Sequence, residues 1–188
     1  VVPGEARRVV ADAAEGDWGV ARALGEQLIA QFPKQAEEAA RLSRHVLGQL
    51  FPALRSDEEP TSVTGSAPDR SFLLRQLRDW MLSIAKTQRM LILVDDLDRL
   101  DEASLALLTG LAHKAQRHAL LLVMTIVEEP SRPLPAALQM LFNSKNNLEL
   151  GELAAPQTEA LIRSLFGDVA NVQLCAARIH GLSSGNPR

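Results

Sequence analysis

Two apolar runs separated by a helix-length segment constrain the fold of this chain most strongly. The first, "MLILVDD" (residues 90–96), ends on adjacent aspartates, and the second, "ALLLVMTIV", covers residues 119–127. Between them the pattern predicts a helix over about 102–117. Continuous apolar runs of this length are typical of strands buried in a parallel sheet, with helices as the crossovers. We therefore predict an α/β fold in which a parallel sheet is sandwiched by helices.

The remaining segments predict further helices and short strands. Val9 and Val10 form the β-favouring centre of a strand within residues 7–14. A shorter apolar run, "NLELGEL", covers residues 147–153, and the charged, Pro- and Gly-containing stretch 55–69 predicts a mobile loop. Further helices are predicted within 16–33, over 35–51 with Leu42 on the apolar stripe, over 70–87 and 134–144, and as an amphipathic pair joined by Gly167 and Asp168.

Composition excludes several classes of protein. The chain has 188 residues, 46% of them hydrophobic, so it can bury a core, and its net charge of −3 gives no electrostatic footprint for nucleic acid. No apolar run approaches the roughly 20 residues needed to cross a bilayer, so we expect a cytoplasmic protein without membrane contact. Neither Val1 nor the final "GNPR" resembles a natural terminus, so we expect part of a longer protein.

The adjacent acids Asp95 and Asp96 are the main candidate site. Ligands of open parallel sheets bind beyond the carboxyl ends of the strands, where these acids are expected. Four apolar residues followed by two aspartates have the form of a Walker B motif. In that interpretation Asp95 orients a hydrated Mg²⁺ ion, and Asp96 polarises the attacking water as a catalytic base. The alternative is that both residues only end a strand and begin a turn.

The segments flanking the acids extend this pattern. "LILVDDLDRLDEASLALLTGLA" followed by "HALLLVMTIVEEP" resembles the P-loop ATPase modules of the AAA+/STAND class, found in bacterial transcription regulators, adenylate cyclases and serine/threonine kinases. The matching positions are Asp98, Asp101, Ser104-Leu105 and Leu107-Leu108. "LELGELAAPQTEALIRSLFG" is similar to the entry into the family's helical lid, and "GLSSGNP" to the turn near the adenine.

The resemblance implies a division of the chain and a ligand. Residues 1–153 would be a partial P-loop ATPase-like core, and residues 154–188 the beginning of a helical lid subdomain. Mg²⁺ and ATP would be the cofactors, with Gly185 and Pro187 near the base and Thr125 in contact with nucleotide. The alternatives are an ordinary helix stop at Gly185 and Pro187, and a Thr125 hydroxyl bonded to backbone. The partners would be other domains of a larger signalling protein, with self-association as a further option.

The chain departs from the family in its phosphate-binding parts. No "GxxxxGK[ST]" occurs, and the glycines of "GVARALGEQL" lie in a predicted helix. Val127 stands where the family carries a phosphate-sensing arginine. Arg132 and Arg163 are then the candidates for contacting phosphate. We therefore expect this polypeptide to bind nucleotide with millimolar or weaker affinity and not to hydrolyse it. Without the P-loop strand, we expect either "NLEL" to pair with "ALLLVMTI" or a partner chain to close the gap.

Two functions of other classes compete with a regulatory ATP-binding module. One is a non-catalytic interaction or scaffold domain derived from an ATPase core. The other is an unrelated α/β enzyme with a carboxylate metal site, which needs further acids such as Asp98 or Glu128. The sequence has no HExxH motif and no close Cys/His pair, so a zinc site is not expected.

Overall fold

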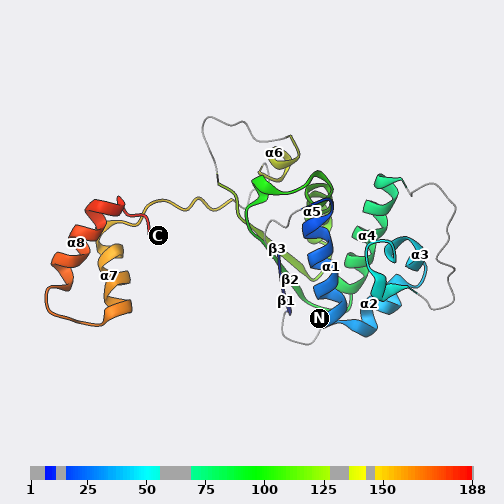
Figure 1. The fold of residues 1–188 in the computed structure, drawn as a ribbon, viewed down its shortest axis with the longest axis horizontal. Helices are drawn as coiled ribbons and strands as arrows, with labels where there is room; N and C mark the ends of the chain where they lie inside the picture. The colour runs from blue at the N-terminus through cyan, green and yellow to red at the C-terminus, as the bar shows by residue number, and fades with distance from the viewer. Residues whose placement is uncertain (1–6, 12–15, 56–68, 128–135, 143–146, 188) are drawn as a thin grey trace. The chain divides into compact units, whose positions relative to one another are not determined.

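The computed structural model describes residues 7–11, 16–55, 69–127, 136–142 and 147–187. The chain divides into two compact units, Val1–Ser144 and Lys145–Arg188, each of which is described separately below (Figure 1). The predicted loop at 55–69 falls almost entirely outside the described residues. Among the helices that are described, none is both long and apolar enough to cross a membrane.

The first unit is built on a small parallel sheet. Its strands are β1 (Arg7–Ala11), β2 (Met90–Val94) and β3 (Leu120–Met124), in the order β1-β2-β3, and all pairs are parallel. The mixed α/β class predicted from the sequence is therefore confirmed. The other elements of this unit are α1 (Gly19–Gln31), α2 (Pro33–Ala40), α3 (Arg44–Leu47), the 3₁₀ helices η1 (Pro52–Leu54) and η2 (Leu97–Arg99), α4 (Arg70–Ala85), α5 (Glu102–Ala115) and α6 (Ala136–Phe142).

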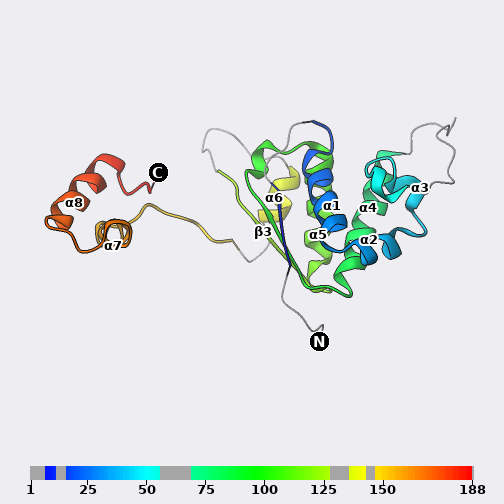
Figure 2. The same cartoon turned by 60° about the horizontal axis from the view of Figure 1, so that its bottom comes forward.

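The helices of this unit lie on one face of the sheet (Figures 1 and 2). Successive strands are added in one direction, and right-handed crossovers then place their connecting helices on the same side. Burial alternates accordingly, because Ile92 and Val94 are buried on the helix face while Leu121 and Val123 are exposed on the other. For the described part of the first unit, the prediction of a sheet sandwiched by helices is therefore wrong.

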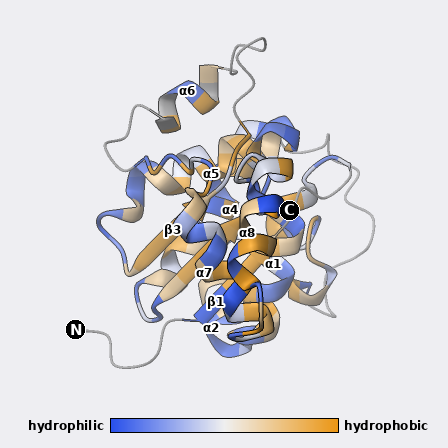
Figure 3. Cartoon of the chain, turned by 90° about the vertical axis from the view of Figure 1, so that its left-hand side faces the viewer, coloured by the Kyte–Doolittle hydropathy of each residue, from blue (hydrophilic) through white to orange (hydrophobic). Residues whose placement is uncertain are grey.

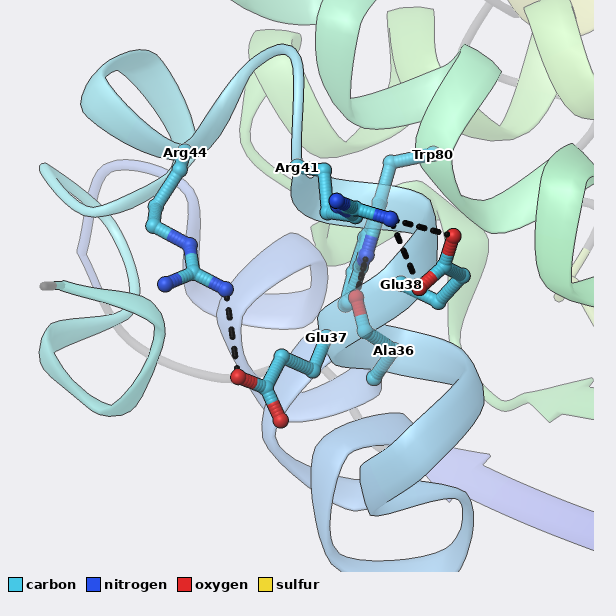
Figure 4. A network of polar contacts seen from close by, with 6 residues as sticks. All are labelled: Ala36, Glu37, Glu38, Arg41, Arg44 and Trp80. Atoms are coloured by element: carbon cyan, nitrogen blue, oxygen red, sulfur yellow. Dashed lines mark hydrogen bonds and ion pairs between the residues drawn. The ribbon is translucent and has the colours of Figure 1, made fainter.

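The core on the helix face is closed around Trp80. Its Nε1 donates a hydrogen bond of 2.9 Å to the carbonyl of Ala36 on α2 (Figure 4). Its ring lies 5.4 Å from that of Phe51, and both residues are buried. Phe51 in turn packs against Gly25 of α1, where an added Cβ would lie 2.1 Å from the ring. The glycine is thus used for close packing between a helix and an aromatic ring.

The predicted helix over residues 35–51 is interrupted. Helix α2 ends at Ala40, and α3 begins at Arg44 after a turn. Leu42 lies in this turn and is 97% exposed, whereas Val46 and Leu47 are buried. The placement of Leu42 on a buried stripe was therefore wrong, because the turn changes the direction in which the side chain points.

The second unit is a pair of helices with an extended lead-in. Helices α7 (Ala155–Phe166) and α8 (Val172–Ser183) are joined through Gly167, whose φ of 77° ends α7. Residues 147–153 belong to this unit and form no strand, so the strand expected over "NLEL", one of two alternatives for completing the sheet, is not formed. The lead-in is attached to the end of α8 instead, where the Leu153 amide donates to the Gly185 carbonyl at 2.9 Å.

Candidate functional site

The carboxyl ends of the three strands lie side by side at one end of the sheet. The amide of Asp95 donates to the carbonyl of Ala11 at 3.2 Å, and the amide of Thr125 donates to the carbonyl of Val94 at 3.0 Å. These bonds continue the parallel ladders one residue beyond the strands. The first carboxylate after β2 is therefore held by backbone bonds to both neighbouring strands.

Asp95 and Thr125 form a hydrogen-bonded pair at this end. The Thr125 hydroxyl donates to Asp95 Oδ1, and the amide of Asp96 donates to both Asp95 Oδ1 and Thr125 Oγ1 at 3.2 Å. The following amide, that of Leu97, donates to the Thr125 carbonyl at 3.0 Å. The Thr125 hydroxyl therefore has a backbone partner, as the alternative from the sequence expected, and in addition donates to a carboxylate.

Asp96 turns the chain sharply after β2. Its φ of 53° lies in the left-handed region, which aspartate tolerates better than most residues. Its carboxylate forms an ion pair with Arg99 at 3.3 Å, in which the side chains are 38% and 71% exposed, respectively. A pair this exposed contributes little to stability and exchanges readily with water. Asp96 is thus accessible, although a cation competes for its carboxylate.

The carboxylate of Asp95 fits the requirements of a hydrated Mg²⁺ ion. Asp95 is exposed, and within the described part of the chain its second oxygen, Oδ2, has no protein partner. Magnesium retains most of its waters and is commonly bound by one or two carboxylates, so one fixed oxygen is a sufficient anchor. The described residues contain no group of three or more His, Cys, Asp or Glu that would enclose a metal ion. The site therefore suits an ion held mainly by water and ligand.

Asp98 and Asp101, the other acids of this segment, have different surroundings. Asp98 Oδ1 is buried and has no hydrogen-bond partner among the described residues, and an unsatisfied polar atom of this kind costs roughly 1–3 kcal/mol. Asp101 begins α5 as its N-cap and accepts hydrogen bonds of 3.0 Å from the amides of Ala103 and Ser104. Neither Asp98 nor Asp101 therefore supplies a second metal ligand beside Asp95. Glu128, the further acid considered from the sequence, lies outside the described residues, as does Arg132.

The Asp101 carboxylate also joins α5 to α1. It accepts a hydrogen bond from the Trp18 amide at 3.2 Å and another from the Ser104 hydroxyl, which itself accepts from the Ala21 amide at 3.1 Å. Burial raises the pKa of Asp101, but the bonds from Ser104, Trp18 and Ala103 outweigh it and lower the pKa below its ordinary value. Sequence reasoning assigned Asp101 to the ATPase pattern and missed this joint, although an acid before an apolar helix is an N-cap signal.

The remaining candidates lie in the second unit or make local contacts. Gly185 and Pro187 follow α8 in that unit. Gly185 has a φ of 81°, and a Cβ there would lie 2.3 Å from the Leu153 carbonyl, so closure of the helical pair explains this glycine. Arg163 pairs with Glu159 and Asp168 on and beside its own helix. Val127 is exposed.

A second charged region lies on α2 and α3. It is a shallow hollow of about 360 Å³ in which Glu37 pairs with Arg44 at 3.2 Å and Glu38 pairs with Arg41 at 3.1 Å (Figure 4). Lys34 completes its lining. Acids and bases neutralise one another here, and most of these side chains are well solvated, so the hollow favours no ligand of a particular charge.

Comparisons of the chain with protein-family models, with curated proteins and with solved structures gave no match.

Proposed function

We propose that the chain is a regulatory, ATPase-like nucleotide-binding module of a larger, cytoplasmic bacterial signalling protein. It would bind Mg-nucleotide weakly when isolated. One observation carries this proposal: Asp95 follows the middle strand of a parallel sheet and is held by Thr125, which follows the neighbouring strand. Ligands of such sheets bind at this end, and a fixed strand-end carboxylate beside a hydroxyl suits a hydrated divalent cation with its phosphates.

Each residue has a role that follows from its contacts. Asp95 would hold the ion or one of its waters through Oδ2, while Thr125 fixes the orientation of the carboxylate. When bound, Mg²⁺ supplies positive charge that neutralises phosphate oxygens. Asp96 would accept a proton from an attacking water, but only after releasing Arg99, whose guanidinium otherwise occupies the carboxylate.

The expected affinity is low because one part of a phosphate site is missing from the sequence. Phosphates in this class of site are bound by consecutive backbone amides and a lysine of a Gly-rich loop, and no such motif occurs here. Carboxylates alone repel phosphates and act only through the cation. We therefore expect a dissociation constant of about 1 mM or higher for Mg-ATP, and no measurable hydrolysis by the isolated chain.

Calorimetric titration of the chain with Mg-ATP tests this proposal. Asp95→Asn keeps the size of the side chain but removes its charge, and is expected to abolish the weak binding. Glu26→Gln removes one negative charge from an exposed position of α1 and is the matched control, which should leave binding unchanged. Equal binding by all three proteins, or no heat for the wild type at millimolar nucleotide, would count against the proposal.

A non-catalytic interaction domain is the second candidate, and a separate observation favours it. Leu121 and Val123 of β3 are 60% and 45% exposed on the face of the sheet that the described helices of the first unit leave open. Apolar surface of this kind is often an interaction site. Association that is unaffected by both nucleotide and Asp95→Asn would support this function over the first.

A further inference from the structure

The two edges of the sheet are treated differently by the rest of the chain. On the outer edge of β1, the Gln27 side chain accepts a hydrogen bond from the Val10 amide at 3.1 Å and donates one to the Val10 carbonyl. Gln31 donates to the Arg8 carbonyl at 2.9 Å. Two glutamines of α1 thus occupy backbone groups with which another strand would pair. Such side-chain cover is a way of closing an edge strand.

The outer edge of β3 carries no such cover. The Ala119 carbonyl and the Thr125 amide are bonded toward β2, so the alternation of a parallel ladder directs the backbone groups of Leu120, Leu122 and Met124 outward. Within the described parts of the first unit, these outward groups have no partner. Residues 119–127 also contain no charged residue and no proline, the usual protection of an exposed edge.

Apolar surface on the open face continues to this edge. The strand register forms two rows, Arg8–Leu91–Leu121 and Val10–Leu93–Val123. The side chains become more exposed from β2 to β3, where Leu121 and Val123 are the most exposed apolar members. Figure 3 faces this side of the sheet and shows the hydrophobic colouring of β3. An added strand at β3 would extend both rows.

We propose that β3 is a dimerisation edge, at which two copies of this chain pair antiparallel across a twofold axis at Leu122. This register pairs all three outward residues, because Leu122 then faces its own counterpart and Leu120 faces Met124 of the second copy. On the open face, Leu121 lies opposite Val123 of the second copy. The two apolar rows of each copy therefore continue into those of the other, and cross-strand apolar pairs stabilise the contact.

Charge favours this antiparallel arrangement. Exposed Arg89 and Arg117 lie near the starts of β2 and β3. The exposed Asp95, together with Asp96, follows the other end of β2. Antiparallel pairing places the basic end of one copy beside the acidic end of the other. Parallel pairing would place like charges together, which is unfavourable.

Because the β1 edge is covered, the association ends at a closed dimer. If both edges were open, β3 of one copy could pair with β1 of the next and build a filament, as heterologous contacts do. Gln27 and Gln31 occupy that edge, so of the two edges of the described sheet β3 is the one left for pairing. The expected product is a twofold dimer with one continuous sheet. This inference concerns association without nucleotide and does not depend on the nucleotide-binding proposal, although it uses the same exposed Leu121 and Val123 as the second candidate function.

Sedimentation analysis of the chain over a range of concentrations tests the proposal. The wild type is expected to sediment as a dimer in equilibrium with monomer. Leu121→Lys and Val123→Glu each place a charge in the apolar row, and each should raise the dimer dissociation constant about tenfold or more. Both positions are exposed, so circular dichroism should show an intact fold. Leu42→Lys, at an exposed leucine on another element, is the control and should leave the dimer unchanged.

A mixture of the two charged variants tests the register. In a mixed dimer the introduced lysine lies opposite the introduced glutamate, and the other cross-strand pair remains Val123 with Leu121. Mixing should therefore restore dimer formation toward the wild-type level. A wild type that is monomeric up to about 1 mM, dimers that persist in both single variants, or a mixture without recovery would each overturn the proposal.

Discussion

At the scale of single residues, the effect of replacing a helix glycine on stability depends on which atoms the added Cβ would contact. Gly25 and Gly110 both occupy helices, and an isolated helix would gain about 0.5–1 kcal/mol from alanine at either position. A Cβ at Gly25 would lie 2.1 Å from the buried ring of Phe51, whereas one at Gly110 would lie 3.1 Å from Arg78 Cδ. The ring is enclosed by core, whereas Arg78 Cδ belongs to a long, flexible side chain whose guanidinium pairs with Asp79 outside the core.

Gly25→Ala is therefore expected to lower the free energy of unfolding by roughly 1–3 kcal/mol, the range for overpacking a core. Gly110→Ala should be neutral or stabilising, because Arg78 moves aside and the helix gains rigidity. Urea denaturation followed by circular dichroism measures both values. A stable Gly25→Ala variant would mean that the packing of Phe51 against α1 is looser than the structure indicates.

At the scale of elements, Asp101 couples the beginnings of two helices. It caps α5 and accepts a hydrogen bond from Trp18 before α1, with Ser104 completing the link to Ala21. Its pKa is lowered in the folded state by these bonds. A group whose folded pKa is depressed stabilises the protein above its unfolded pKa, and this contribution is lost as the pH falls through the folded pKa.

Asp101→Asn is therefore expected to cost about 1 kcal/mol of stability at neutral pH. The amide oxygen of asparagine can still accept the backbone bonds made to Oδ1, but the amide nitrogen that replaces Oδ2 cannot accept the bond from the Ser104 hydroxyl. The difference from wild type should be full above about pH 4, near the unfolded pKa of aspartate, and should shrink as the pH is lowered further. Chemical denaturation at several pH values measures this. Asp69→Asn, at the exposed N-cap of α4 with one amide partner at 3.3 Å, should have a smaller effect.

At the scale of the whole molecule, the two units differ in how much core they contain. The buried cluster of the second unit consists of Ile162, Val172 and Ala176, whereas that of the first unit spans its sheet and helices. Leu165, Phe166, Leu174 and Leu182 remain exposed within the second unit. Burial of so few apolar side chains offsets only a small part of the conformational entropy that is lost when two helices become ordered.

Amides of α7 and α8 are therefore expected to exchange with solvent deuterium much sooner than those of α4 and α5. The free energy of opening should be lower by about 2 kcal/mol or more, since local stability follows buried apolar contact. Hydrogen exchange with mass spectrometry measures both units in one sample. Equal protection of α7 and α4 would contradict this expectation and would indicate that further contacts cover the second unit.

Local patterns in the sequence were sufficient for most elements of this molecule. The stripe of Leu73, Leu77, Trp80, Met81 and Ile84 is buried on α4 as its periodicity predicts, and the run before Asp95 is the middle strand of the sheet. The position of the acids at the end of that strand followed from the same run. Such features are readable because burial imposes a period of 3.6 or 2 residues on the segment that forms the element.

Contacts between distant segments account for what the sequence did not reveal. Leu42 points outward because a turn separates α2 from α3, and the amide of Leu153 bonds to the carbonyl of Gly185, which follows α8. The pairing of Thr125 with Asp95, the link from Asp101 to Trp18, and the cover of β1 by Gln27 each join residues far apart in the chain. Periodicity reports how one segment meets its surroundings, whereas these contacts depend on which segments become neighbours after folding.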